Sequence, residues 1–138
     1  SQDDQAKFYT ALYHSMTSPT TWSEESKQYF GFDNTIHDLP TNMEAVYTDL
    51  SIWDTYRSQY PLILLHDPQR MQDVSNSMLK MAEQSGALPK WAYKQGDAGS
   101  MIGTHSNAVL ADQIVKEEYV ATKFNCTQAL EASKYVAN

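Results

Sequence analysis

The chain has 138 residues, of which 41% are hydrophobic and 20% are charged, so it is long and apolar enough to build a packed core. Its net charge of -7 argues against nucleic acid and anionic membrane surfaces as partners, because phosphate binding requires clustered lysine and arginine. No apolar run approaches the roughly 20 residues that cross a bilayer, which argues against membrane insertion.

The first third of the chain predicts one helix and one long loop. Apolar residues recur at helical spacing over residues 3–18, and Pro19 ends that helix. Residues 19–46 carry turn residues throughout and predict a loop, with a short strand over 29–32. Loops of this length are uncommon unless they have a function.

The middle of the chain predicts two further helices. One covers residues 48–60 and is broken or kinked by Pro61. The next begins at Asp67, a capping residue followed by proline, and ends at Gly86, which favours a left-handed turn. Residues 87–105 form a second long irregular segment.

Two more helices are predicted at the end, over 106–122 with Thr104 or Ser106 as the cap, and after Thr127. Sequential helices with short links tend to pack antiparallel. The alternation of short and long loops therefore predicts an all-α fold, built of antiparallel helical hairpins as part of an α/α toroid with its long loops at one end. Residues 1–138 form a single segment of that fold.

The run from Asp49 to Arg57 is the most informative part of the sequence. On a helix, Arg57 lies beside both Trp53 and Asp54, because positions three and four apart share a face. An indole next to a carboxylate paired with a guanidinium suits a sugar, whose apolar face stacks on the ring while its hydroxyls bond to the charges. The alternative is a core tryptophan next to a surface ion pair.

Other candidate binding residues lie in the long loops or at a helix beginning, where binding residues concentrate. They are Phe32 and Asp33 in the first loop, Trp91 in the second, and His105 at the start of a helix. The four histidines show no metal-ligand spacing, and the single cysteine excludes a zinc site built from cysteines. No metal ligand is therefore predicted in this chain.

One N-glycosylation sequon is present, at Asn125-Cys126-Thr127. In a secretory protein Asn125 would carry a glycan and Cys126 would be available to pair with another chain. The alternative is a chance tripeptide with a buried thiol.

An ordered series of motifs resembles a known family, glycoside hydrolase family 92, the calcium-dependent exo-α-mannosidases. The series covers nearly the whole chain, and its members are Phe8-Tyr9-Thr10-Ala11-Leu12-Tyr13-His14-Ser15, Gly31-Phe32-Asp33, Tyr47 through Arg57, Leu88-Pro89-Lys90-Trp91, Met101-Ile102-Gly103-Thr104-His105 and Ala111-Asp112. A local departure is residues 95–100, which stand where the family usually has a different linker.

The resemblance implies that this chain is the first portion of an (α/α)6 catalytic barrel, without the family's N-terminal β-sandwich and its C-terminal catalytic part. Such enzymes hydrolyse terminal α-mannosides with inversion, using a general-acid Glu, an Asp base and a bound calcium ion. The general acid, the base and most calcium ligands would lie C-terminal to this region, so the resemblance implies no catalytic residue here and an inactive isolated chain.

What the chain retains, by resemblance, is contact with the terminal mannose of a glycan. Trp53 and Asp54 would touch the sugar, with Arg57 orienting Asp54, and the pocket rim would include Phe32, Asp33, Trp91 and His105. The expected partners are a mannose-containing glycan and the rest of the barrel or other copies of the chain. The expected location is secreted or in a lysosomal or endomembrane lumen. The alternative function is a non-catalytic structural or sugar-binding subunit derived from such a barrel.

Overall fold

The computed structural model describes residues 1–120 and 125–134. The helices within these ranges are α1 (Gln2–Ser15), α2 (Ile52–Thr55), α3 (Gln59–His66), α4 (Pro68–Ser85), α5 (His105–Val120) and α6 (Cys126–Ser133). The strands are β1 (Thr20–Thr21), β2 (Gln28–Phe30), β3 (Ile36–Asp38), β4 (Tyr47–Thr48), β5 (Ala92–Tyr93) and β6 (Gly96–Asp97). Residues 121–122 of the predicted fourth long helix lie outside the described residues.

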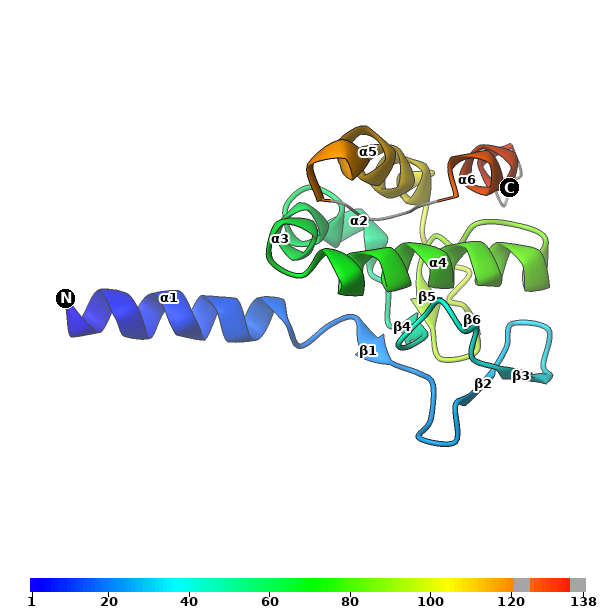
Figure 1. The fold of residues 1–138 in the computed structure, drawn as a ribbon, viewed down its shortest axis with the longest axis horizontal. Coiled ribbons are helices and arrows are strands. Elements are labelled where there is room, and N and C mark those ends of the chain that lie inside the picture. Colours follow the sequence, from blue (N-terminus) through cyan, green and yellow to red (C-terminus); the bar gives the residue numbers. More distant parts are fainter. Residues whose placement is uncertain (121–124, 135–138) are drawn as a thin grey trace.

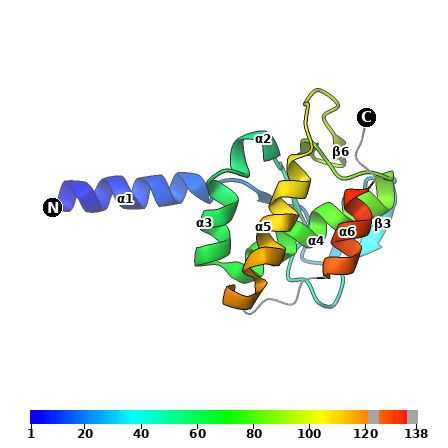
Figure 2. The same cartoon turned by 90° about the horizontal axis from the view of Figure 1, so that it is seen from above.

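Helix α4 is the centre of the fold, and both of its predicted ends are confirmed. The Asp67 side chain accepts a hydrogen bond from the backbone N–H of Arg70 at 3.1 Å, and Gly86 closes the helix at a φ of 85°. Its buried residues contact α3, α5 and α6, which lie across it (Figures 1 and 2). The main apolar core therefore forms around one helix.

The helices around α4 follow the expected hairpin pattern only in part. Helices α5 and α6 contact each other and run in opposite directions (Figure 2). Helix α3 instead crosses α4 at a steep angle (Figures 1 and 2). The reason is the link between them: Asp67 alone joins the two helices, whereas an antiparallel helical hairpin needs a loop of about 2–5 residues.

The two long loops contain short antiparallel strand pairs, which the all-α prediction did not include. Strand β1 pairs with β4, β2 with β3, and β5 with β6. Each strand has two or three residues, so these pairs brace the loops rather than form a sheet-based core. The short strand predicted over 29–32 corresponds to β2, which ends two residues earlier.

The predicted helix over residues 48–60 is wrong, because two short helices stand in its place. Helix α2 ends at Thr55, and α3 begins at Gln59. Pro61 does not break a helix here. It lies in the first turn of α3, where a backbone N–H would have no partner within the helix.

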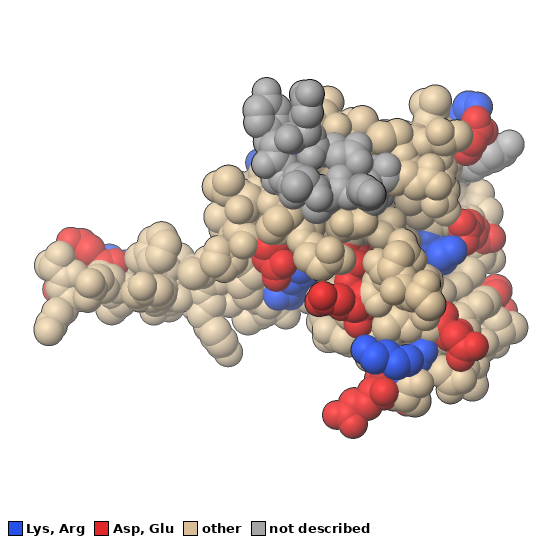
Figure 3. Space-filling model, viewed as in Figure 1, with Lys and Arg blue, Asp and Glu red and all other residues tan. Residues whose placement is uncertain are grey.

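Helix α1 projects from the body of the molecule as an arm (Figure 1). Ser1 and Asp4 form a capping box at its beginning. None of its residues is buried, and Phe8, one of the apolar residues at helical spacing, is 62% exposed. Beyond Lys7 the arm carries no Lys, Arg, Asp or Glu, and it is largely uncharged in Figure 3. The arm thus presents an uncharged, aromatic-rich surface that the described residues leave uncovered.

Candidate functional site

An aromatic cluster forms where α2 meets the beginning of α5. The His105 ring stacks on the Tyr56 ring at 4.7 Å between centroids, and meets the Trp53 ring edge-on at 4.8 Å. The Arg57 guanidinium lies over the Trp53 ring in α2, at 5.2 Å from its centroid, and over the ring of Tyr56, which directly follows α2, at 4.8 Å. Three of the predicted contacts, Trp53, Arg57 and His105, are therefore brought together, with Tyr56 at their centre.

The position of His105 depends on a glycine two residues earlier. Gly103 has a φ of 89°, and a Cβ atom there would lie 2.6 Å from Nε2 of His105. That nitrogen is buried and has no hydrogen-bond partner among the described residues. The adjacent Ser106 donates its hydroxyl to the carbonyl of Pro89 and so ties α5 to the second long loop. Of the two predicted caps, Ser106 lies inside α5, whereas Thr104 directly precedes the helix.

The predicted ion pair between Asp54 and Arg57 does not form. Arg57 donates from Nη1 to the carbonyl of Trp53 at 3.1 Å, and Asp54 accepts from the hydroxyl of Ser51 at 2.6 Å. No ion pair joins the two residues within the described part of the chain. Arg57 lies over the Trp53 ring, as a spacing of four on a helix predicts, but α2 ends at Thr55 and Arg57 forms no pair with Asp54.

The Asp54 carboxylate lies beside a separate hollow of about 310 Å³. This hollow is bounded by the last turn of α1, by α2 and by the beginning of α3. Its lining residues are His14, Ser15, Asp54, Thr55, Ser58, Gln59 and Leu62. Ser51 engages only Oδ2 of Asp54, and no other described residue bonds to this side chain. A carboxylate in a hollow lined mainly by polar residue types is equipped to accept hydrogen bonds from hydroxyl groups.

Trp91 is half-buried and lies next to a strand contact with the segment before α2. Its neighbour Ala92 bridges Leu50, with 2.9 Å between the Leu50 nitrogen and the Ala92 oxygen. The backbone N–H of Trp91 donates to the Asp97 carboxylate at 3.0 Å, which fixes the loop. The Trp91 segment is thus fastened both to the chain leading into α2 and, through Pro89, to α5.

Phe32 and Asp33 lie elsewhere, in the turn between β2 and β3. The hairpin is fastened to the C-terminal half of α4, where Gln84 accepts a hydrogen bond from the Phe32 N–H at 3.1 Å. Asp33 lies 2.9 Å from His37, and this hydrogen bond lowers the pKa of the Asp33 carboxyl. The hairpin lies apart from α2 in both ribbon views (Figures 1 and 2), so a rim role beside Trp53 stays a prediction.

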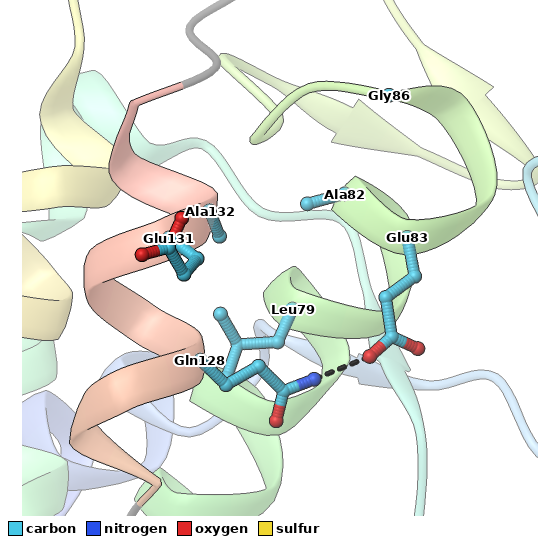
Figure 4. Close-up of a pocket in the computed structure, with 7 residues that line it drawn as sticks. All are labelled: Leu79, Ala82, Glu83, Gly86, Gln128, Glu131 and Ala132. Carbon is cyan, nitrogen blue, oxygen red and sulfur yellow. Dashed lines mark hydrogen bonds between the residues drawn. The ribbon is translucent and has the colours of Figure 1, made fainter.

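An apolar groove of about 180 Å³ lies between α4 and α6 (Figure 4). Leu79, Ala82 and Ala132 form its apolar walls, and Gln128 donates a hydrogen bond to Glu83 across it. None of the predicted sugar-contacting residues lines this groove. It is therefore separate from the candidate site.

The sequon lies at the start of α6. Asn125, not the predicted Thr127, caps this helix, since its side-chain oxygen accepts from the backbone N–H of Gln128 at 3.0 Å. Both Asn125 and Cys126 are exposed, so the alternative of a buried thiol is wrong. The amide nitrogen of Asn125, the atom to which a glycan would attach, is not needed for the cap.

Residues that the sequence reasoning did not assign also shape the site. Tyr56 lies three positions after Trp53, and this helical spacing could have predicted that the two rings lie on the same side. Ser51 and Gly103 lie inside motifs that were noted, but their roles depend on contacts across space. His14 also belongs to a noted motif, yet only the folded chain brings it to Asp54.

The described residues form no obvious ion-binding centre. Across residues 1–120 and 125–134, no three His, Cys, Asp or Glu side chains gather closely enough to hold a metal ion. In the same ranges, no helix combines the length and apolarity that crossing a membrane requires.

Comparisons with known proteins agree with one family. The family model described as "Glycosyl hydrolase family 92 catalytic domain" matches residues 1–138. No curated protein sequence matches the chain. Among solved structures, the family GH92 α-mannosidase BT3965 from Bacteroides thetaiotaomicron, in complex with mannoimidazole, is 36% identical with a TM-score of 0.85 over 93% of this chain. The family GH92 inverting mannosidase BT2199 from Bacteroides thetaiotaomicron VPI-5482 is 31% identical with a TM-score of 0.76 over 91% of this chain.

The chain spans only 16% of the length of each of these two mannosidases. Both are described as enzymes, which does not favour the alternative of a non-catalytic subunit. The match nevertheless extends over the whole of this sequence, at an identity above 30% and with a closely similar fold. The chain belongs to glycoside hydrolase family 92, as a segment of the family's catalytic domain.

Proposed function

We propose that the chain is part of an α-mannosidase that hydrolyses terminal α-mannosides with inversion. The similarity to two GH92 mannosidases in both sequence and fold is the observation that carries this proposal. One of these relatives is described as inverting. Inverting glycosidases use two carboxyl groups roughly 6.5–9.5 Å apart, with a water between them. In this proposal, both groups belong to parts of the protein outside this segment.

The role of this segment is to bind the terminal mannose. Asp54 accepts hydrogen bonds from sugar hydroxyls, since one of its oxygens is held by Ser51 and the other has no partner among the described residues. Trp53 and His105 supply aromatic surface, and Arg57 fixes the cluster from above. Phe32, Asp33 and Trp91 belong to the rim of the assembled site.

The rest of the enzyme supplies what these residues lack. Further barrel helices cover the exposed aromatic side chains of α1, because large apolar surfaces usually mark contact sites. Calcium would be bound mostly by residues outside this segment, and none of the roles given to Trp53, Asp54 or His105 depends on it.

We place the enzyme outside the cell or in a lysosomal or endomembrane lumen, with a glycan on Asn125. Exposure of the sequon at the start of α6 supports this location. Treatment with an N-glycosidase should increase the electrophoretic mobility of the protein from its native source, and Asn125→Gln should abolish that shift. Equal mobility before and after treatment would contradict the glycan.

Substitution of Asp54 tests the proposed function. In the full-length enzyme, Asp54→Asn should lower kcat/KM for an aryl α-mannoside by roughly 10- to 150-fold. That range corresponds to a hydrogen bond to a charged group. Glu131→Gln is the matched control, because Glu131 pairs with Lys134 on the surface of α6 and should leave kcat/KM within about twofold. An Asp54→Asn enzyme as active as this control would contradict the binding role.

A further inference from the structure

The last turn of α1 faces the same hollow as Asp54. His14, from the exposed arm, lines this hollow together with Asp54 and Ser58. His14 and Asp54 are 40 positions apart in the sequence. The rest of the arm points away from the body (Figure 1). His14 is therefore the residue of the arm that lies next to the candidate binding residue Asp54.

Two side chains fasten this end of α1 to the body. The Gln59 amide donates to the carbonyl oxygens of Ser15 and Ser18, at 2.5 Å each. Arg70 donates to the carbonyls of Met16 and Pro19, at 3.4 and 3.1 Å. These bonds connect residues more than 40 positions apart and hold the chain on both sides of the turn that follows α1. His14 is consequently held beside α2 rather than carried on a loose arm.

The chemistry of the hollow complements a polyhydroxylated ligand. Asp54 is acceptor-only when ionised, so it binds hydroxyl groups that donate. The His14 imidazole has no hydrogen-bond partner among the described residues, and the aromatic ring near it in this part of the chain is that of Tyr13, at 5.8 Å between centroids. A neutral imidazole both donates and accepts, which lets it bond to a second hydroxyl in either direction. Leu62 adds a small apolar wall.

We propose that His14 is a second binding residue for the terminal mannoside, acting across the hollow from Asp54. This inference rests on the proposed function and adds a contact from a different helix. Helix α1 then has a direct part in recognition, besides its part in the architecture of the barrel. The ligand class is a terminal hexoside whose hydroxyl groups reach both side chains.

The test distinguishes the contribution of the imidazole nitrogens to binding from the contribution of the ring's volume. In the full-length enzyme, His14→Phe keeps a ring but removes both nitrogens, and His14→Gln keeps a donor and an acceptor. We expect His14→Phe to lower kcat/KM for an aryl α-mannoside by about 3- to 10-fold, mainly through KM, as for a neutral hydrogen bond. His14→Gln should recover most of this loss. His66→Phe, at an exposed histidine of α3 outside the hollow, is the matched control and should stay within about twofold.

The Asp54→Asn enzyme, measured in parallel, distinguishes two kinds of failure. If Asp54→Asn impairs the enzyme but His14→Phe matches the His66→Phe control, the His14 contact is refuted and the proposed function stands. If both variants act like the control, the mannose-binding role proposed for this segment fails as well. Equal losses in His14→Phe and His14→Gln would also overturn the inference, since the nitrogens would then not matter.

Discussion

Asp73 fastens the loop that leads into the candidate site to the central helix. Its Oδ2 atom accepts from the backbone N–H groups of Glu44 at 2.8 Å and Ala45 at 3.2 Å, and Oδ1 accepts from Gln69 at 3.2 Å. The residue is 1% exposed, and no cation pairs with it in the described residues. Hydrogen bonds therefore take the place of a counter-ion for this buried carboxylate.

The expected cost of Asp73→Ala follows from these contacts. The substitution leaves two backbone N–H groups without their acceptor, and each hydrogen bond to a charged group contributes about 1.5–3 kcal/mol. Burial raises the pKa of the Asp73 carboxyl, so desolvation of the charge offsets part of that gain. We expect Asp73→Ala to lower the free energy of unfolding by about 2–4 kcal/mol, and Asp73→Asn, which keeps one acceptor oxygen, by about half as much.

The raised pKa also fixes the sign of a pH effect. Because folded Asp73 binds its proton more tightly than the unfolded chain does, protonation contributes stability below the unfolded pKa of about 3.9. That contribution is lost as the pH rises from there through the folded pKa. The free energy of unfolding should therefore fall over this interval in the wild type relative to Asp73→Asn.

Urea denaturation followed by tryptophan fluorescence measures the loss, and hydrogen exchange reports on the two amides directly. Glu44 and Ala45 should lose protection in Asp73→Ala, while the interior of α4 keeps it. Glu131→Ala is the control, since its carboxylate forms a surface pair with Lys134 worth about 0–1 kcal/mol. Equal destabilisation by the two substitutions, or unchanged exchange at both amides, would refute the reasoning.

Two further predictions concern burial and exposure. Burial raises the pKa of Tyr60 to about 12. As the pH rises above 10, Tyr60 therefore ionises in the unfolded chain before it does in the folded one, which lowers the free energy of unfolding. Tyr60→Phe should remove about 1.4 kcal/mol per pH unit of this alkaline loss, as measured by urea denaturation between pH 9 and 11. Identical pH profiles of the wild type and the variant would contradict this. The isolated chain should self-associate in light scattering through the arm, where Phe8 and Tyr13 are 62% and 69% exposed, and a Phe8→Gln, Tyr13→Gln variant should associate less. A wild-type chain that stays monomeric at high concentration would show that this surface is not adhesive.

The parts of the fold that could be predicted from the sequence are those with local causes. Asp67, Pro68 and Gly86 mark the ends of α4 through capping and backbone preferences that depend on adjacent residues alone. The break between α2 and α3 has no comparable local signal, because Pro61 suggested a helix end at the wrong place. Long-range contacts surround that break, such as the Leu50–Ala92 bridge and the bonds of Gln59 to the end of α1.

The same limit applies to the candidate site. The clustering of Trp53, Arg57 and His105 was expected from the motif series, and the folded chain brings the three together. The pairing of Asp54 with Arg57 assumed one continuous helix and is wrong for that reason. The hollow shared with His14 could not be predicted from spacing, since it needs α1 to be fastened beside α2.

The short length of α2 divides the site between two environments. Trp53 turns toward His105 and supports an aromatic cluster, whereas Asp54, the next residue, faces the hollow beside α1. The two residues are therefore not equivalent candidates for sugar contact. The indole already meets one ring and lies under one guanidinium, while the carboxylate keeps an oxygen without a partner among the described residues. We therefore expect polar recognition of the sugar to depend on Asp54, with the aromatic cluster holding α2 in the orientation that presents this carboxylate.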